Sequence, residues 1–280
     1  MSEIELSVIV INFNTFQYTR KCIESVYNFT KDISFEVILV DNASTEGDIT
    51  QLKNTFQDII LIRNNVNEGF ARANNQGIKI SKGAKIILLN SDTYLVENSF
   101  KVLTQLIDEL PGSGVVSPLL RYPNGKIQHS AQSFPSVKKN LVELFRLQKI
   151  NQSYSKTLAG SFFDHNQTVE TDWVWGTCFM LKAEVISKMD GLLDEKYFMY
   201  GEDRQWCLDI RKLGYEIWHT NRTHIVHIGG GSGMQNSVVL KQRETDFLIR
   251  NYSFYYRLVY SFTALLLQWD RFLIDKIRRI

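Results

Sequence analysis

The chain has 280 residues, of which 44% are hydrophobic, enough for one large core or for one domain with an appendage. Charged residues make up 22% and the net charge is +2, so we expect no nucleic-acid partner. No stretch approaches about 18 consecutive apolar residues, and the first residues lack a secretion-signal pattern, so we expect a cytoplasmic protein. The three cysteines lack metal-ligand spacing, which favours buried free thiols: Cys22, Cys178 and Cys207.

Apolar runs alternate with amphipathic patterns through the first half of the chain. Aliphatic runs predict buried strands over residues 6–11, 35–40, 59–62 and 85–89. Helical spacing predicts helices over residues 15–29, 48–58, 69–81 and 98–110. This alternation predicts an α/β fold with a mostly parallel sheet and helices on both faces. Three of the four prolines lie between 111 and 123, which predicts irregular chain there.

Polar residues follow three of the predicted strands, at segments 12–14, 41–44 and 90–92. Each segment alone is typical of a turn. Three of them at the carboxyl edge of one parallel sheet predict a ligand pocket instead. Asn90 and Asp92 are two residues apart at a strand end, so their oxygens suit a divalent cation such as Mg²⁺ or Mn²⁺.

Two adjacent carboxylates, Glu202 and Asp203, lie in an aromatic and apolar segment, 197–206. Burial against apolar surface raises the pKa of a carboxylate and makes it a better proton acceptor, which suits a general base. Alternatively, the pair caps the helix predicted over 204–213, which Gly214 ends. The residues alone favour neither interpretation.

Four segments in order, 8–14, 67–77, 88–93 and 191–203, resemble the inverting family 2 glycosyltransferases, in the branch with bacterial rhamnosyltransferases and galactofuranosyltransferases. The resemblance covers nearly all of residues 5–250. It implies the GT-A fold over residues 1–250, with a Rossmann-like twisted sheet and a helical appendage at 251–280. It also implies sugar transfer from deoxythymidine diphosphate–rhamnose or a uridine diphosphate–sugar to a hydroxyl of a glycan acceptor. A lipid-linked oligosaccharide in cell-surface polysaccharide synthesis is the implied acceptor.

The resemblance assigns roles to single residues. Asp203 matches the catalytic base, and Asp92 matches the last acid of the metal-binding D-x-D motif, whose first acid is replaced by Asn90. His227 matches a metal-binding histidine and precedes a glycine run, 229–233, that allows close approach to phosphate. The implied donor-binding residues are Ile11, Asn12, Asn14, Asp41, Asn42, Arg72, Asn90, Ser91 and Asp92. The implied acceptor-binding residues are Trp175, Gly176 and Glu202.

The C-terminal segment, 251–280, is rich in aromatic residues and ends in a basic stretch, 276–280. Its apolar run is too short and too interrupted to span a bilayer. Such helices often lie in the membrane interface, which would place the protein peripherally on the inner membrane. Packing on the domain, or on a second subunit of a homo-oligomer, is an equal alternative.

Two other functions are compatible with parts of the pattern. A sugar-phosphate nucleotidyltransferase would share the sheet and a metal-binding acid, but it normally has a glycine-rich basic loop after the first strand. This chain has residues 12–16, Asn-Phe-Asn-Thr-Phe, at that place. A non-catalytic sugar-binding or scaffold protein would need neither Asp92 nor Asp203.

Overall fold

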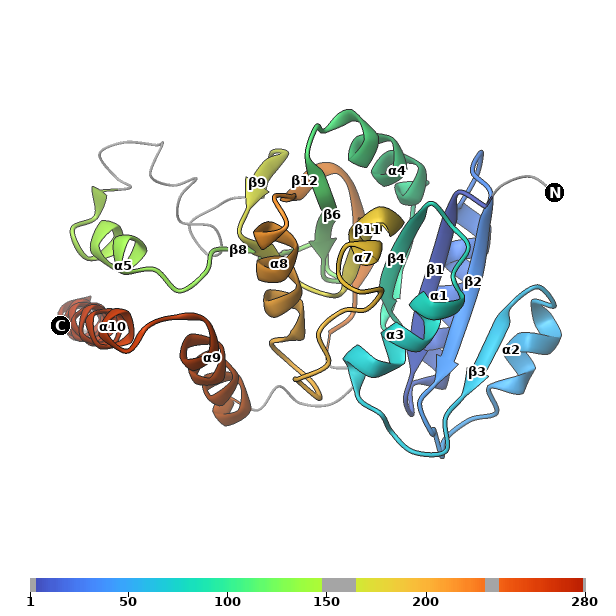
Figure 1. Ribbon diagram of the computed structural model, residues 1–280, viewed down its shortest axis with the longest axis horizontal. Helices are drawn as coiled ribbons and strands as arrows, with labels where there is room; N and C mark the ends of the chain where they lie inside the picture. Colours follow the sequence, from blue (N-terminus) through green and yellow to red (C-terminus); the bar gives the residue numbers. More distant parts are fainter. Residues whose placement is uncertain (1–3, 148–164, 230–236, 279–280) are drawn as a thin grey trace.

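A computed structural model describes residues 4–147, 165–229 and 237–278 of the chain, and its core is one ten-stranded sheet (Figure 1). Four parallel strands form its N-terminal half: β1 (Leu6–Asn12), β2 (Phe35–Asp41), β3 (Ile60–Arg63) and β4 (Lys85–Asn90). They lie within one residue of the predicted strands. Every residue of β1 is buried, because helices cover both faces of the sheet.

Alternate residues along β1 point to two separate cores. Val8 and Val10 join the first core with helices α1 (Phe16–Phe29), α2 (Thr50–Thr55) and α4 (Ser99–Glu109). Ile9 and Ile11 join the second core with helices α3 (Phe70–Ile80), α7 (Ala183–Ser187) and α8 (Glu202–Lys212). Helix α2 is shorter than predicted, because Phe56 leaves the helical conformation and its ring stacks on Tyr27 at 4.5 Å.

The second half of the sheet is mixed. Its strands are β5 (Thr93–Tyr94), β6 (Ser113–Arg121), β7 (Ile127–Gln128), β9 (Val169–Thr171), β11 (Cys178–Lys182) and β12 (Glu216–His227). Strand β11 enters antiparallel between β4 and β6, and β12 runs parallel to β6. Two short strands, β8 (Ala131–Gln132) and β10 (Trp173–Val174), pair beside it. The expected mostly parallel α/β sheet is therefore extended by antiparallel additions.

The irregular chain predicted between residues 111 and 123 is wrong, because β6 occupies most of this stretch. Pro118 lies inside the strand, paired with Thr220 of β12. Immediately after this pair the register of β12 shifts, and His224 is the next residue that pairs with β6. Proline cannot donate a ladder hydrogen bond, and a bulge in the partner strand is one place where a sheet accommodates it.

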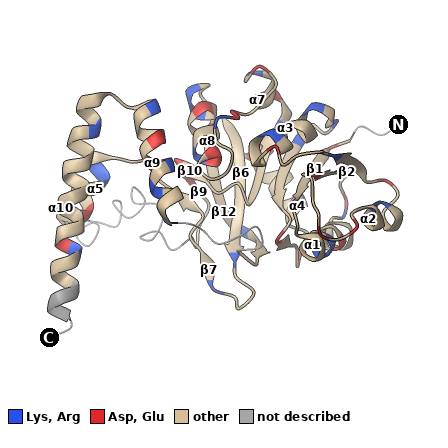
Figure 2. Ribbon diagram, turned by 90° about the horizontal axis from the view of Figure 1, so that it is seen from below, with Lys and Arg blue, Asp and Glu red and all other residues tan. Residues whose placement is uncertain are grey.

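Three further helices extend from one side of the sheet: α5 (Val137–Leu144), α9 (Ser237–Asn251) and α10 (Phe254–Arg278). Helix α10 projects from the body as a long rod and packs along α5 (Figure 2). Asn140 donates a 3.0 Å hydrogen bond to the Thr263 hydroxyl across this contact. Within the described residues, no helix is long and apolar enough to cross a membrane. The division into domains at residue 250 stays a prediction.

Candidate active site

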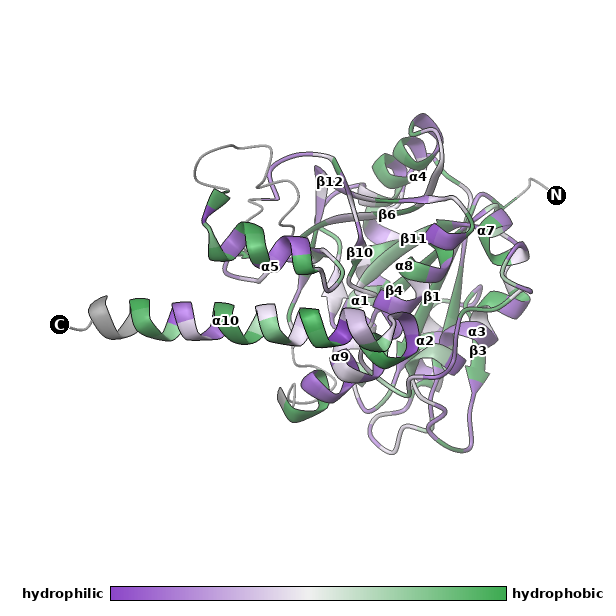
Figure 3. Ribbon diagram, turned by 60° about the vertical axis from the view of Figure 1, so that its left-hand side comes forward, coloured by the Kyte–Doolittle hydropathy of each residue, from purple (hydrophilic) through white to green (hydrophobic). Residues whose placement is uncertain are grey.

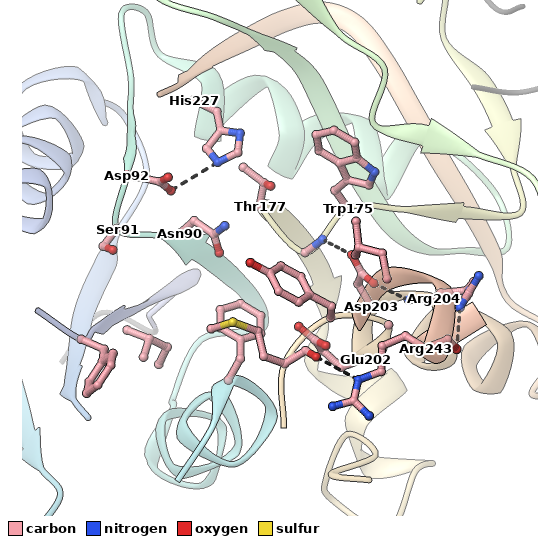
Figure 4. A pocket seen from close by; sticks show the side chains of 18 of the residues that line it. Asn90, Ser91, Asp92, Trp175, Thr177, Glu202, Asp203, Arg204, His227 and Arg243 are labelled. Atoms are coloured by element: carbon pink, nitrogen blue, oxygen red, sulfur yellow. Dashed lines mark hydrogen bonds and ion pairs between the residues drawn. The ribbon is translucent and has the colours of Figure 1, made fainter. Parts of the chain in front are cut away.

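The carboxyl ends of β1 and β4 open onto a cavity of about 470 Å³ (Figure 4). In the sheet, β2 and β3 lie on one side of β1, and β4 lies on the other side. The strand order therefore reverses between β1 and β4. Ile11 and Asn90 line the cavity from these two strands, and the first turn of α8 lines it from the opposite side. The fold therefore places the predicted pocket at the switch point of the sheet.

Asp203 reaches the cavity through an unusual turn. Tyr200 and Gly201 have positive φ angles of 67° and 91°, and they direct the chain into α8. The Asp203 carboxylate accepts hydrogen bonds from the amides of Gly176, at 3.1 Å, and Arg204, at 2.8 Å. Burial raises the pKa of this carboxyl group, while the Gly176 hydrogen bond opposes the shift. Gly201 holds the N-cap position, and both acids lie in the first turn of α8.

Glu202 lies beside Asp203 but has different surroundings. Its side chain is buried, and within the described part of the chain its Oε2 atom has no hydrogen-bond partner. Burial, and then repulsion from Asp203, raise the pKa of Glu202 to about 8. The two backbone amides that donate to Asp203 favour the charged form of its carboxyl group, and among the described residues Glu202 Oε2 has no such donor.

Asp92 and His227 face each other across the cavity wall from the ends of β4 and β12 (Figure 4). Asp92 Oδ1 lies 3.3 Å from His227 Nε2. Gln128 orients the ring: its amide nitrogen donates to the His227 carbonyl at 2.7 Å, and its Oε1 lies 2.6 Å from Nδ1. Because Oε1 can only accept, Nδ1 carries a hydrogen, and Nε2 presents either a proton or a lone pair toward Asp92. This arrangement is typical of a metal-binding histidine held by a second residue.

The residues around this pair fit a divalent metal that is bound together with a phosphate group. Asn90 Oδ1 is buried, and among the described residues it has no hydrogen-bond partner. An amide oxygen, a carboxylate and an imidazole are a suitable donor set for Mn²⁺ or Mg²⁺. The described residues contain no group of three histidine, cysteine or acidic side chains that could hold a metal alone. A metal here would therefore complete its coordination with phosphate and water.

The predicted donor-binding residues divide into two groups. Those that line the cavity are Ile11, Asn42, Asn90, Ser91 and Asp92. Those outside its lining are Asn12, Asn14, Asp41 and Arg72. Asn12 donates to Asp41 at 3.0 Å, and Asn14 accepts from the amide of Thr45 at 2.8 Å. These polar side chains hold together the loops that follow β1 and β2.

Arg72 lies on the exposed surface of α3, away from the cavity lining. It pairs with Glu68 at 3.5 Å and with Glu195 at 3.3 Å. Its predicted contact with the donor, like those of Asn12, Asn14 and Asp41, stays a prediction.

The predicted catalytic, metal and acceptor residues all line the same cavity: Asp203, Asp92, His227, Trp175, Gly176 and Glu202. Of the glycine run after His227, residues 230–233 lie outside the described residues.

Two arginines that sequence reasoning missed also line this cavity. The Arg204 guanidinium lies over the Phe247 ring at 4.3 Å and donates to the Arg243 carbonyl at 3.1 Å. Arg243 Nε donates to the carbonyl of Met199 at 3.2 Å. Arg204 directly follows the acidic pair in the sequence, and this position could have marked it as a residue of the site. No local pattern marks Arg243, which comes from α9.

The sheet and the position of the cavity define the class of protein: this is a GT-A fold. A crystal structure of GalNAc-T7 with UDP, GalNAc and Mn²⁺ matches it with a TM-score of 0.58 and 14% identity, over 80% of this chain and 43% of that chain. The sequence matches the family described as Glycosyl transferase family 2 over residues 7–188. The chain belongs to glycosyl transferase family 2, as the resemblance predicted.

Curated relatives of the chain are bacterial. One is the uncharacterized protein y4gI of Sinorhizobium fredii, 23% identical over 256 residues, which are 88% of this chain and 27% of that protein. Another is the N-acetylglucosaminyl-diphospho-decaprenol L-rhamnosyltransferase of Mycobacterium tuberculosis. It is 21% identical over 246 residues, and the match covers 79% of this chain and 75% of that protein. The chain spans less than half the length of several curated relatives that it matches, y4gI among them.

Proposed function

We propose that the chain is an inverting glycosyltransferase, which moves a sugar from a nucleoside-diphosphate sugar to a hydroxyl of a glycan acceptor. One observation carries the proposal: a single cavity contains both the half-buried Asp203 carboxylate and the Asp92–His227 pair. A base and a site for a diphosphate are the two groups that a single displacement needs. Membership of family 2 supports the same reaction.

In the proposed reaction, the Asp203 carboxylate accepts the proton of the acceptor hydroxyl while that oxygen bonds to the anomeric carbon. The bond between this carbon and the diphosphate oxygen breaks, and the nucleoside diphosphate leaves from the opposite face. Protonated Glu202 donates a hydrogen bond that orients the acceptor. Asp92, His227 and the Asn90 amide oxygen would hold a divalent metal, which neutralises charge on the leaving diphosphate. The Mn²⁺ in the GalNAc-T7 crystal supports this assignment.

We further propose that the donor is deoxythymidine diphosphate–rhamnose or a uridine diphosphate–sugar. The acceptor is a lipid-linked glycan of cell-surface polysaccharide synthesis. The name of the mycobacterial relative, a rhamnosyltransferase acting on a diphospho-decaprenol, supports both assignments. Peripheral contact with a membrane would suit such an acceptor, and the exposed apolar face of α10 supports it.

Donor turnover by the purified protein tests the proposal. Incubated with Mn²⁺ and a panel of nucleotide sugars, the protein should release nucleoside diphosphate. Asp203→Asn should fold, because an amide oxygen can still accept from Gly176, and should be slower by about 10²–10⁴-fold. Asp209→Asn, the same change on the same helix outside the cavity lining, serves as the control.

Two outcomes would contradict the proposal. Near-normal turnover by Asp203→Asn would exclude its role as the base. Release of pyrophosphate when the protein is given a nucleoside triphosphate and a sugar 1-phosphate, with no nucleoside diphosphate released from nucleotide sugars, would favour a nucleotidyltransferase.

A further inference from the structure

A second cavity, of about 320 Å³, lies beside the first, between the segment after β8 and helices α5 and α10. Its volume falls in the range of small-molecule sites, about 300–1,000 Å³. The two cavities share Gln132, Arg204 and Glu244 in their walls. The two cavities therefore adjoin at these three side chains.

The charged residues in the wall of the second cavity are unevenly paired. Arg271 forms an ion pair with Glu143, and Glu244 accepts a hydrogen bond from the Tyr260 hydroxyl at 2.9 Å. The other two cations are Lys139 and Arg204, which line the cavity. Neither forms an ion pair with any carboxylate of the described chain. The cavity wall therefore carries an excess of positive charge.

Arg204 is the more constrained of these two cations. Its guanidinium lies against Phe247, and its Nε atom is buried with no hydrogen-bond partner in the part of the chain that the structure describes. Burial lowers the pKa of Arg204, and it also lowers the pKa of Lys139. A buried donor without an acceptor costs about 1–3 kcal/mol, and more when it is charged. An anion in the cavity would stabilise the charged form of both side chains, which burial disfavours.

We infer that the second cavity binds a phosphate or diphosphate group of the acceptor, while the acceptor sugar occupies the first cavity. The inference rests on the proposed function and adds the chemical class of the acceptor. Asp203 and Arg204 are consecutive residues, so a hydroxyl at the base and a phosphate at the guanidinium belong to neighbouring parts of one molecule. Arginine and lysine together are typical of phosphate recognition. A neutral glycan would leave both cations without a directly paired anion, although carboxylates such as Glu244 lie near enough to attract them.

Calorimetric titration of the full-length protein with inorganic pyrophosphate in EDTA tests this site. EDTA removes the divalent metal that the donor-diphosphate site would use, so the remaining binding reports on other anion sites. Wild type should bind, and Lys139→Met should bind about tenfold more weakly or worse, since a charge-assisted contact is lost. Lys138→Met, which changes the exposed neighbour on α5, should bind as wild type does. Lys139→Arg keeps the charge and should retain most of the affinity.

Two outcomes would overturn the inference: no binding of pyrophosphate by wild type, or equal binding by wild type and Lys139→Met. Phosphatidylcholine vesicles with and without farnesyl diphosphate then identify the source of the phosphate. A lipid-linked acceptor predicts that farnesyl diphosphate increases vesicle binding by wild type and not by Lys139→Met. A soluble phosphorylated glycan predicts pyrophosphate binding without this increase. Donor turnover is read separately, so a protein that binds pyrophosphate but releases no nucleotide contradicts the proposed function alone.

Discussion

Glu202 and Asp203 are neighbours in the chain, yet their carboxyl groups have different partners. The Asp203 carboxylate accepts hydrogen bonds from two backbone amides, whereas among the described residues Glu202 Oε2 accepts none. Both groups are desolvated, which raises the pKa of each, and the two amides at Asp203 oppose that rise. The hydrogen bonds therefore favour a negative charge on Asp203 over one on Glu202, although the two side chains differ by one methylene group.

The raised pKa of Glu202 makes stability depend on pH. Its folded-state pKa of about 8 exceeds the usual 4.5, so the folded protein binds this proton more tightly than the unfolded chain does. The resulting stabilisation is complete below about pH 4.5 and is lost as the pH rises through about 8. Glu202→Gln cannot ionise, so its Tm should fall less than that of wild type between pH 5 and 8. Thermal denaturation at several pH values measures this difference.

Glu46→Gln is the control for this measurement, because Glu46 is an exposed carboxylate outside the cavity lining. Its Tm should follow the wild-type pH dependence. A Glu202→Gln variant with the wild-type slope would show that Glu202 is ionised in the folded protein at neutral pH.

At the scale of elements, the contact of helix α3 with strand β1 depends on a glycine. Gly77 faces the fully buried Ile9, and a Cβ atom added at Gly77 would lie 2.6 Å from Ile9 Cγ2. This methyl group is bonded to the β-carbon of Ile9, so it cannot move away unless the side chain rotates or the backbone shifts. The close approach brings α3 onto the second core, beside the loop that follows β1.

Gly77→Ala tests this packing, because two effects of opposite sign compete. Alanine favours a helix over glycine by about 1 kcal/mol. Overpacking a core costs about 1–3 kcal/mol, and the rigid neighbour places this site at the upper end. We expect a net loss of about 2 kcal/mol, with a Tm lower by about 4–8 °C. Denaturation of the purified variant measures the change.

A double-mutant cycle with Ile9→Ala gives the control. Removing the Ile9 side chain opens space, so Gly77→Ala should be neutral or stabilising in that background. Equal effects of Gly77→Ala in both backgrounds would mean that the contact with Ile9 is not what limits this position.

On the scale of the whole molecule, helix α10 has two faces with different roles. One face packs on α5, and the other exposes large apolar side chains. Hydrophobic residues recur along the ribbon of α10 where it projects from the body (Figure 3). These side chains are Phe254, Tyr255, Leu258, Val259, Phe262, Leu265, Leu266, Trp269, Phe272 and Leu273. Aromatic residues gathered on one exposed face are typical of helices that lie in the membrane interface.

We expect the full-length protein to co-sediment with anionic lipid vesicles through this face. Burying one large side chain is worth about 1.5–3 kcal/mol, so replacing Phe262 and Trp269 by serine should lower vesicle partitioning at least about tenfold. Val66→Ser, at an exposed apolar residue outside α10, should leave partitioning unchanged. Unchanged sedimentation of the double variant would contradict membrane binding. A dimer that the same substitutions dissociate would favour the packing of two copies instead.

Most of the catalytic half of the site could be predicted from sequence, because the signals are local. Strands β1, β2 and β4 are short aliphatic runs, and Asp92 and Asp203 lie next to the elements that position them. Asn12 and Asp41 show the limit of that reasoning, since the same polar residues serve either a ligand or a loop. Their mutual hydrogen bond is a feature of the folded loops, and no local pattern predicts it.

The sequence by itself determined the class of sheet, the family and the two acids on which the proposed chemistry depends, since short-range periodicity and ordered motifs encode them. Only the tertiary structure decided which partners these groups meet. Gln128 orients His227 from 99 residues away, and β12 brings His227 to Asp92. Arg204 and Lys139 share a cavity for the same reason. Contacts between distant segments depend on how the whole sheet and its helices pack, and no spacing along the chain records that packing.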